Sequence, residues 1–296
     1  MSWTARRERG GALLPWLMLW IMRNLGWSAG QLLLYPITAW FYVTSAGARA
    51  ASREYLCQVL GRPARQRDVI RHLFTFACVI LDRVFFLAGR TADYEITVQG
   101  LEAITRLADA GSGCVLLGSH LGSFDVLRAF GRNAPVRVRP VMFRGNMGYV
   151  SGLLEALDPE LRRDVIEIGS PGAMLQVREC VERGEIVGFL ADRTPFPGRM
   201  VVARFLGRNT EFPSGPLVVA SAVGAPVVLF YGVRTAPRRY LIRFEDFAER
   251  IELPRGRRDA ALQRWIDAYS ERLAAACLAY PFNWFNFYPF WKPSDG

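Results

Sequence analysis

The chain has 296 residues, of which 51% are hydrophobic and 22% are charged, and its formal net charge is +10. This length suffices for one large hydrophobic core or two modest ones. Lys292 is the only lysine, so the chain has no Gly-x4-Gly-Lys loop for nucleotide binding. A basic chain rich in apolar and aromatic residues favours an anionic bilayer surface over nucleic acid as its partner. An ordinary solvated basic face is the alternative.

The five cysteines stand far apart in the sequence, and none forms a Cys-x2-Cys pair. This spacing is typical neither of a zinc site nor of a disulfide framework. We therefore expect a protein of a reducing compartment, without a metal site and without a cofactor.

After the arginines of the first ten residues, the N-terminal segment is almost uncharged. Arg23 is the only charged residue between Gly11 and Ala48. A span of this length reaches the roughly 20 apolar residues that cross a bilayer, although glycines and Pro36 dilute it. We predict that residues 1–50 form a hydrophobic helical membrane anchor, either as one crossing or as a hairpin lying in the interface. The arginines before it favour a cytoplasmic N-terminus.

Residues 50–89 show helical spacing that is interrupted at Gly61-Arg62-Pro63, which predicts two helices. The second helix contains His72, one of two histidines in the chain. We interpret it as a partly buried packing residue, because its only acidic neighbour is Asp68, one turn earlier. A strand at 94–98 and a short helix at 101–107 follow.

The stretch from Gly111 to Phe130 carries the strongest functional signal. Cys114–Leu117 is an uncharged apolar run typical of a buried strand, and helical spacing begins at Ser123. Between them lies His120, at a junction of the kind that presents side chains and backbone N–H groups to ligands. Asp125 follows five residues later, so its carboxylate can orient one imidazole nitrogen and leave the other as a base. Alternatively, Asp125 caps the helix and His120 bonds only local backbone.

Polar side chains also follow the strands predicted at 136–143 and 186–190. They are Arg144, Asn146, Asp192 and Arg193. Because parallel strands end at the same edge of a sheet, we expect these groups near His120. The two arginines are candidates for binding a phosphate or carboxylate of a substrate, and structural ion pairs with Asp192 or Glu211 are the alternative.

The remaining pattern alternates strands and helices with short turns. Strands are predicted at 164–168, 199–205, 227–231 and 240–244, and helices at 149–157, 171–183, 217–223 and 259–279. This alternation favours an α/β fold with a mostly parallel sheet covered by helices on both faces, formed by residues 51–296 as one domain. The tail Tyr280–Trp291 has eight aromatic residues and no charge. It suits a membrane headgroup boundary or packing against the N-terminal helices equally well.

Several blocks of the sequence, taken in order, resemble a known family. The segment Ser119-His120-Leu121-Gly122-Ser123-Phe124-Asp125 is similar to the His-x4-Asp/Glu box of the lysophospholipid acyltransferase superfamily. Four later blocks resemble those of the lauroyl and myristoyl acyltransferases of lipid A biosynthesis. They are Phe143–Asn146, Ala191–Thr194, Thr210–Gly215 and the region of Trp284.

Two departures make the chain resemble a divergent relative of the lipid A branch. Asp125 stands where the lipid A enzymes usually carry Glu, and Ser214-Gly215 stands where phospholipid members carry Glu-Gly-Thr.

The resemblance implies a membrane-associated O-acyltransferase on the cytoplasmic face of the bacterial inner membrane. It would move an acyl chain from a thioester, on acyl carrier protein or CoA, to a hydroxyl of a lipid-type acceptor. His120 and Asp125 would be catalytic, with backbone N–H groups around Gly122 holding the oxyanion. The implied substrate-binding residues are Ser119, Gly122, Ser123, Arg144, Asn146, Asp192, Arg193, Ser214 and Gly215.

Two other functions remain open from the sequence. One is a lipid or thioester hydrolase that uses the same site with water as the acceptor. The other is a non-catalytic basic protein that coats or tethers membrane. Transfer of the acyl group to a lipid acceptor would distinguish an acyltransferase from the hydrolase. Loss of activity on replacing Asp125 would distinguish an enzyme from the non-catalytic protein.

Overall fold

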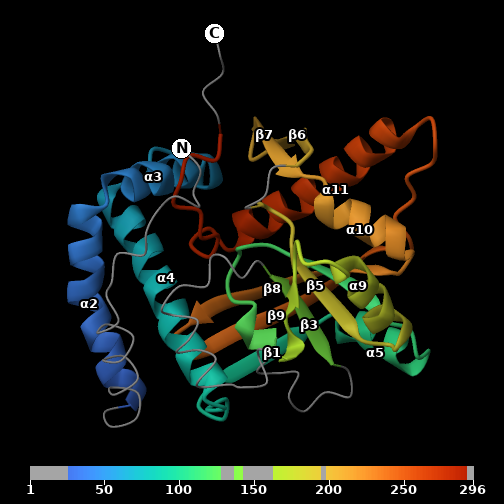
Figure 1. The fold of residues 1–296 in the computed structure, drawn as a ribbon. Helices are drawn as coiled ribbons and strands as arrows, with labels where there is room; N and C mark the ends of the chain where they lie inside the picture. Colours follow the sequence, from blue (N-terminus) through green and yellow to red (C-terminus); the bar gives the residue numbers. More distant parts are fainter. Residues whose placement is uncertain (1–25, 128–136, 143–162, 195–197, 292–296) are drawn as a thin grey trace.

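The structure is a computed structural model that describes residues 26–127, 137–142, 163–194 and 198–291. Within these ranges a seven-stranded sheet has the strand order β1-β9-β8-β2-β5-β3-β4 (Figure 1). Its strands are β1 (Glu95–Gln99), β2 (Cys114–Gly118), β3 (Val138–Met142), β4 (Ile166–Glu167), β5 (Ile186–Leu190), β8 (Val227–Ala236) and β9 (Arg239–Ala248). The helices are α2 (Gly26–Thr44), α3 (Ala46–Leu60), α4 (Gln66–Leu87), α5 (Leu101–Asp109), α9 (Ala173–Glu182), α10 (Gly215–Val223) and α11 (Arg258–Ala279).

The sheet is mostly parallel, as the alternation of strands and helices predicts. Strand β2 runs parallel to both β5 and β8, and β3 runs parallel to β5 and β4. Strand β9 is antiparallel to β8, because the two residues between them form a hairpin turn and cannot support a parallel crossover. In the β2–β5 register Gly118 lies opposite Leu190. The chain segments that follow these two strands therefore leave the sheet side by side.

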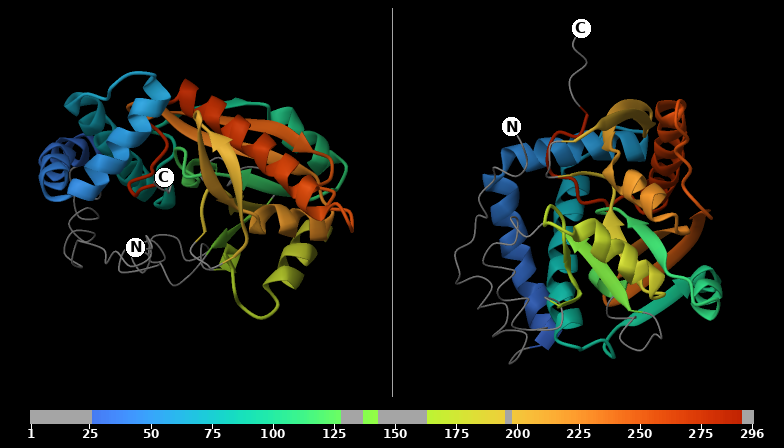
Figure 2. Two further views of the ribbon diagram at one scale, coloured as in Figure 1. Left: turned by 90° about the horizontal axis from the view of Figure 1, so that it is seen from above. Right: turned by 45° about the vertical axis from the view of Figure 1, so that its right-hand side comes forward.

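Strand β2 is buried on both faces, which explains its uncharged sequence. Val115 and Leu117 belong to a core shared with α9, α10 and α11, whereas Cys114 and Leu116 belong to a core shared with α4 and α5. Figure 2 shows the two helical layers on either side of the sheet. This central strand carries the His120 junction at its carboxyl end.

The predicted membrane anchor is wrong for the part of the N-terminal segment that the structure describes. Across the described ranges, no helix combines the length with the apolar character needed to cross a bilayer. Helix α2 contains Pro36 and packs along α4, burying Trp27 and Leu34 in the core (Figure 1). Residue 50, the predicted end of the anchor, lies inside α3. These N-terminal helices thus pack against the rest of the protein.

The aromatic tail forms a strap, residues 280–291, that packs in the interior. Trp284, Phe285, Phe290 and Trp291 are buried, and Tyr55 of α3 contacts Trp284 edge-on at 4.9 Å between ring centroids. Of the two interpretations left open by the sequence, internal packing therefore accounts for these four side chains. The strap passes between α3 and α11 (Figure 1).

The strand predicted at 199–205 exists, but it does not belong to the main sheet. It is β6 (Met200–Phe205), which pairs antiparallel with β7 (Arg208–Pro213) in a separate hairpin. The hairpin packs on α11, where the Ser270 hydroxyl donates to the Arg204 carbonyl at 2.9 Å. It lies above the carboxyl ends of the strands, on the side of the strap (Figure 1).

Candidate active site

His120 and Asp192 meet where β2 and β5 end. The Nδ1 atom of His120 lies 2.8 Å from Oδ1 of Asp192, and the His120 backbone N–H donates to the same oxygen at 3.1 Å. An ionised carboxylate only accepts hydrogen bonds, so Nδ1 carries the proton and Nε2 keeps its lone pair. The His120 side chain is 30% exposed, and Asp192 is 1% exposed. The arrangement is that of a general base with a buried orienting carboxylate.

The protonation states suit this role. Burial and the Arg193 guanidinium lower the pKa of His120, although Asp192 acts in the opposite direction. Burial opposes the ionisation of Asp192, but His120 and Arg193 lower its pKa to about 2. A neutral imidazole and an ionised carboxylate therefore coexist at neutral pH.

Asp125, the acidic partner expected from the His-x4-Asp spacing, contacts another residue. Its Oδ2 lies 3.0 Å from Nε of Arg83 on helix α4. This ion pair ties the start of the helix after His120 to α4. The carboxylate at hydrogen-bond distance from the imidazole is that of Asp192, which is 72 positions away in sequence.

The loop after His120 is held by backbone hydrogen bonds. Gly122 has φ of +77°, and a Cβ atom there would collide with the Gly232 carbonyl, so the position requires glycine. Its N–H donates to the Asn283 carbonyl at 2.7 Å, and the Ser123 N–H donates to the Gly232 carbonyl at 2.7 Å. These two N–H groups are therefore engaged and do not form the oxyanion site expected around Gly122.

The other predicted residues lie at different distances from this centre. Ser119 and Ser123 are buried beside His120, and their hydroxyls have no hydrogen-bond partner within the described ranges. Arg193 follows Asp192 and donates to the Phe285 carbonyl at 3.2 Å. The Ser214 hydroxyl donates to the Arg199 carbonyl at 2.9 Å, at the start of α10 next to Gly215.

Arg144 and Asn146 lie outside the described residues.

A comparison with protein families shows the class of the protein. The profile of the family described as bacterial lipid A biosynthesis acyltransferase matches residues 7–245, which include His120, Asp125 and Asp192. The chain belongs to this family. No individual curated protein matches it significantly. The protein is thus an acyltransferase of lipid biosynthesis, a class of enzyme that takes an acyl donor and a lipid-type acceptor.

A cleft of about 720 Å³ lies on the Asp192 side of the His120–Asp192 pair. The hairpin β6–β7 and the strap line it, and it reaches Asp192. Arg193, Arg204, Arg208 and Tyr288 are among the residues that line it. Arg208 is paired with Glu54 at 2.7 Å, and Arg193 lies over the Tyr288 ring at 5.5 Å from its centroid. The cleft offers both polar and aromatic contacts beside Asp192.

The sequence also contains a Gly-x-Ser-x-Gly pattern at Gly26–Gly30. In serine hydrolases the serine of this pattern sits on a sharp turn between a strand and a helix. Here Ser28 is exposed within helix α2, so this segment does not form a nucleophile elbow.

Sequence reasoning placed the region of Trp284 among the blocks that resemble the family, but it did not predict the contacts of the strap with His120 and Asp192. The Phe285 N–H donates to the His120 carbonyl at 2.8 Å, and the Trp284 indole N–H donates to Asp192 Oδ2 at 3.1 Å. The available signal was the concentration of aromatic residues without charge in 280–291. That pattern predicts burial, but it does not indicate which loop the segment will contact.

Proposed function

We propose that this acyltransferase moves an acyl chain from a thioester to a hydroxyl group of a membrane lipid, with His120 as the general base. The observation that carries the proposal is the His120–Asp192 pair, in which Nε2 retains its lone pair on a partly exposed ring. Within the described ranges no residue hydrogen-bonds Nε2. The family match supports acyl transfer and a lipid-type acceptor.

In the proposed reaction, Nε2 of His120 accepts the proton of the acceptor hydroxyl while the oxygen attacks the thioester carbonyl carbon. Asp192 stabilises the imidazolium that forms. When the tetrahedral intermediate collapses, its C–S bond breaks and the imidazolium returns the proton to the departing sulfur. The products are an ester and a free thiol, and His120 is neutral again.

We propose acyl carrier protein as the donor, with CoA as the alternative carrier. The support is electrostatic, because carrier proteins are acidic and this chain carries a net charge of +10. Arg53, Arg62, Arg65, Arg67 and Arg71 are exposed on α3, α4 and the turn between them. Steady-state rates with the same acyl chain on the two carriers test this choice. A lower KM for the carrier-protein form that rises with salt supports it, and a lower KM for the CoA form contradicts it.

We also propose that transfer takes place at the cytoplasmic surface of the bacterial inner membrane. A lipid acceptor requires the enzyme to reach a bilayer, and the positive net charge favours an anionic one. Flotation with vesicles of phosphatidylglycerol and phosphatidylcholine tests this step. Binding to the anionic vesicles should fall at high salt, and equal binding to both kinds would contradict the electrostatic attraction.

The central experiment separates transfer from hydrolysis. Purified protein is incubated with a radiolabelled acyl thioester, with and without a lipid extract from an inner membrane, and the label is followed into lipid and into free acid. We expect lipid-dependent incorporation that His120→Ala reduces by about 10³-fold or more. Asp93→Asn is a matched control, since Asp93 forms an exposed ion pair with Arg90 away from the site.

Near-native incorporation by His120→Ala would remove this residue from the mechanism. Release of free acid at the same rate with and without lipid would instead identify a thioester hydrolase.

A further inference from the structure

Trp284 connects the strap to the carboxylate of the catalytic pair. Its indole Nε1 lies 3.1 Å from Oδ2 of Asp192, whereas Oδ1 of the same carboxylate lies 2.8 Å from His120 Nδ1. Each oxygen thus has its own donor, one on either side. A carboxylate held at both oxygens cannot rotate about its terminal bond without losing one of these hydrogen bonds.

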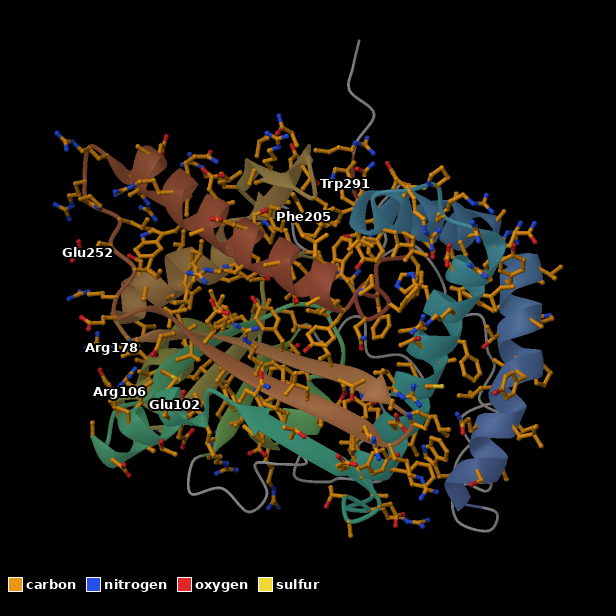
Figure 3. The ribbon with its side chains drawn as sticks, turned by 180° about the vertical axis from the view of Figure 1, so that it is seen from behind. Glu102, Arg106, Arg178, Phe205, Glu252 and Trp291 are labelled. Carbon is orange, nitrogen blue, oxygen red and sulfur yellow. The ribbon has the colours of Figure 1, made fainter. Side chains whose placement is uncertain are left out.

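The Trp284 ring is itself immobile, because aromatic side chains surround it. It is fully buried and makes edge contacts with Tyr55, Phe205 and Phe290 at centroid distances of 4.9, 5.1 and 4.8 Å. Phe205 and Trp291, which border the same cluster, lie next to each other in Figure 3. The indole N–H therefore points to Asp192 as a fixed donor.

The backbone of Trp284 is fixed by the second histidine of the chain. His72 Nε2 lies 2.9 Å from the Trp284 carbonyl oxygen, and His72 Nδ1 lies 2.8 Å from the Ser52 hydroxyl. A carbonyl oxygen only accepts, so Nε2 carries the proton and the Ser52 hydroxyl donates to Nδ1. The strap residues on either side bond to the His120 loop, through Asn283 to Gly122 and through Phe285 to His120.

We infer that Trp284 is a positioning residue for acyl transfer, whose indole N–H orients Asp192 toward His120. The inference rests on the proposed function, because it assigns Trp284 a role through the His120 base. Trp284 lies beyond residues 7–245, the range that the family profile matches. The role follows from the contacts of this chain.

Loss of the indole donor has a predictable electrostatic effect. The indole N–H partly offsets the negative charge of Asp192. Without it, the carboxylate would attract the His120 imidazolium more strongly. The pKa of His120 should therefore rise, and the acid limb of the kcat/KM profile should move to higher pH.

Other charged and titratable groups lie near the pair. They are Arg193 after β5, Tyr269 and Cys277 on α11, and Tyr288 in the strap. Burial raises the pKa of Tyr269 and Cys277 and raises that of Tyr288 to about 12, so these three stay neutral.

The test compares Trp284→Phe with Trp291→Phe. Both variants replace a buried indole of the strap by a phenyl ring, but the Trp291 N–H has no hydrogen-bond partner within the described ranges. We expect Trp284→Phe to lower kcat about tenfold, to leave both KM values within about twofold, and to shift the acid limb upward. Trp291→Phe should leave the acid limb in place.

Equal pH profiles for the two variants would overturn the inference, as would an unchanged kcat in Trp284→Phe. If Trp284→Phe does not fold, a benzothienylalanine at position 284 keeps the shape of the indole and replaces its N–H by sulfur, and the same shift is expected. His120→Ala is measured in parallel. Activity in that variant contradicts the proposed base, whereas its loss together with a normal Trp284→Phe contradicts only the role of Trp284.

Discussion

At the scale of single residues, the two aspartates that the sequence offers to His120 have different contacts. Asp192 is buried and hydrogen-bonded to the imidazole, whereas Asp125 forms an ion pair with Arg83 at 3.0 Å. Both lie within the family match. Only the first can stabilise an imidazolium directly at the observed distances.

We therefore predict unequal effects of removing the two charges. Asp192→Asn should lower kcat/KM by about 10³-fold or more, because the amide no longer stabilises the imidazolium and can hold the wrong tautomer. Asp125→Asn should lower it by about tenfold at most and cost about 1 kcal/mol of stability, since it breaks a partly exposed ion pair. Kinetics and thermal unfolding of both variants check this. A larger loss of kcat/KM in Asp125→Asn than in Asp192→Asn would instead support the His120–Asp125 pairing expected from the His-x4-Asp spacing.

At the scale of elements, helix α4 is the support on which the site is built. It contacts the strap through His72, the helix after His120 through Arg83, and the sheet through Asp82. The Asp82 carboxylate is fully buried and accepts hydrogen bonds from four residues on four elements or turns. These are Trp27, Tyr94, Arg234 and Tyr240. One negative charge thus accepts hydrogen bonds from four residues, and it holds α2 and α4 on the sheet.

Asp82→Asn should destabilise the fold by about 3 kcal/mol or more, because it leaves the Arg234 guanidinium, 9% exposed, without its counter-charge. Urea unfolding measures the loss. Asp93→Asn is again the control, and an exposed pair of that kind should change stability by less than about 1 kcal/mol. A similar small change at Asp82 would show that the buried network contributes little.

At the scale of the whole molecule, the neutral state of His72 couples folding to pH. Burial lowers the pKa of His72 to about 4, although its bond to the Trp284 carbonyl acts in the opposite direction. An unfolded chain binds the proton at about pH 6.5. Between these values the unfolded state binds more protons, so the stability that is fully present above pH 6.5 is lost as pH falls toward 4.

The predicted loss is about 3 kcal/mol over this interval, from a pKa shift of 6.5 to about 4. The free energy of unfolding measured at several pH values should decrease accordingly, and His72→Gln should flatten the curve between pH 6.5 and 4. An equally steep curve in His72→Gln would assign the pH dependence to the carboxylates instead.

The sequence by itself determined those features that depend on neighbouring residues. The apolar run of β2, the change to helical spacing after it and the position of His120 between them all follow from local periodicity. The tertiary structure decided the partners of His120. Asp192 reaches His120 through the β2–β5 register, and the strap brings Trp284 to Asp192 and the Phe285 N–H to the His120 carbonyl, over separations that no local pattern encodes. The anchor prediction failed for a related reason, since an apolar composition does not show whether a helix crosses a bilayer, and in the described structure α2 packs along α4 and is not apolar and long enough to cross one.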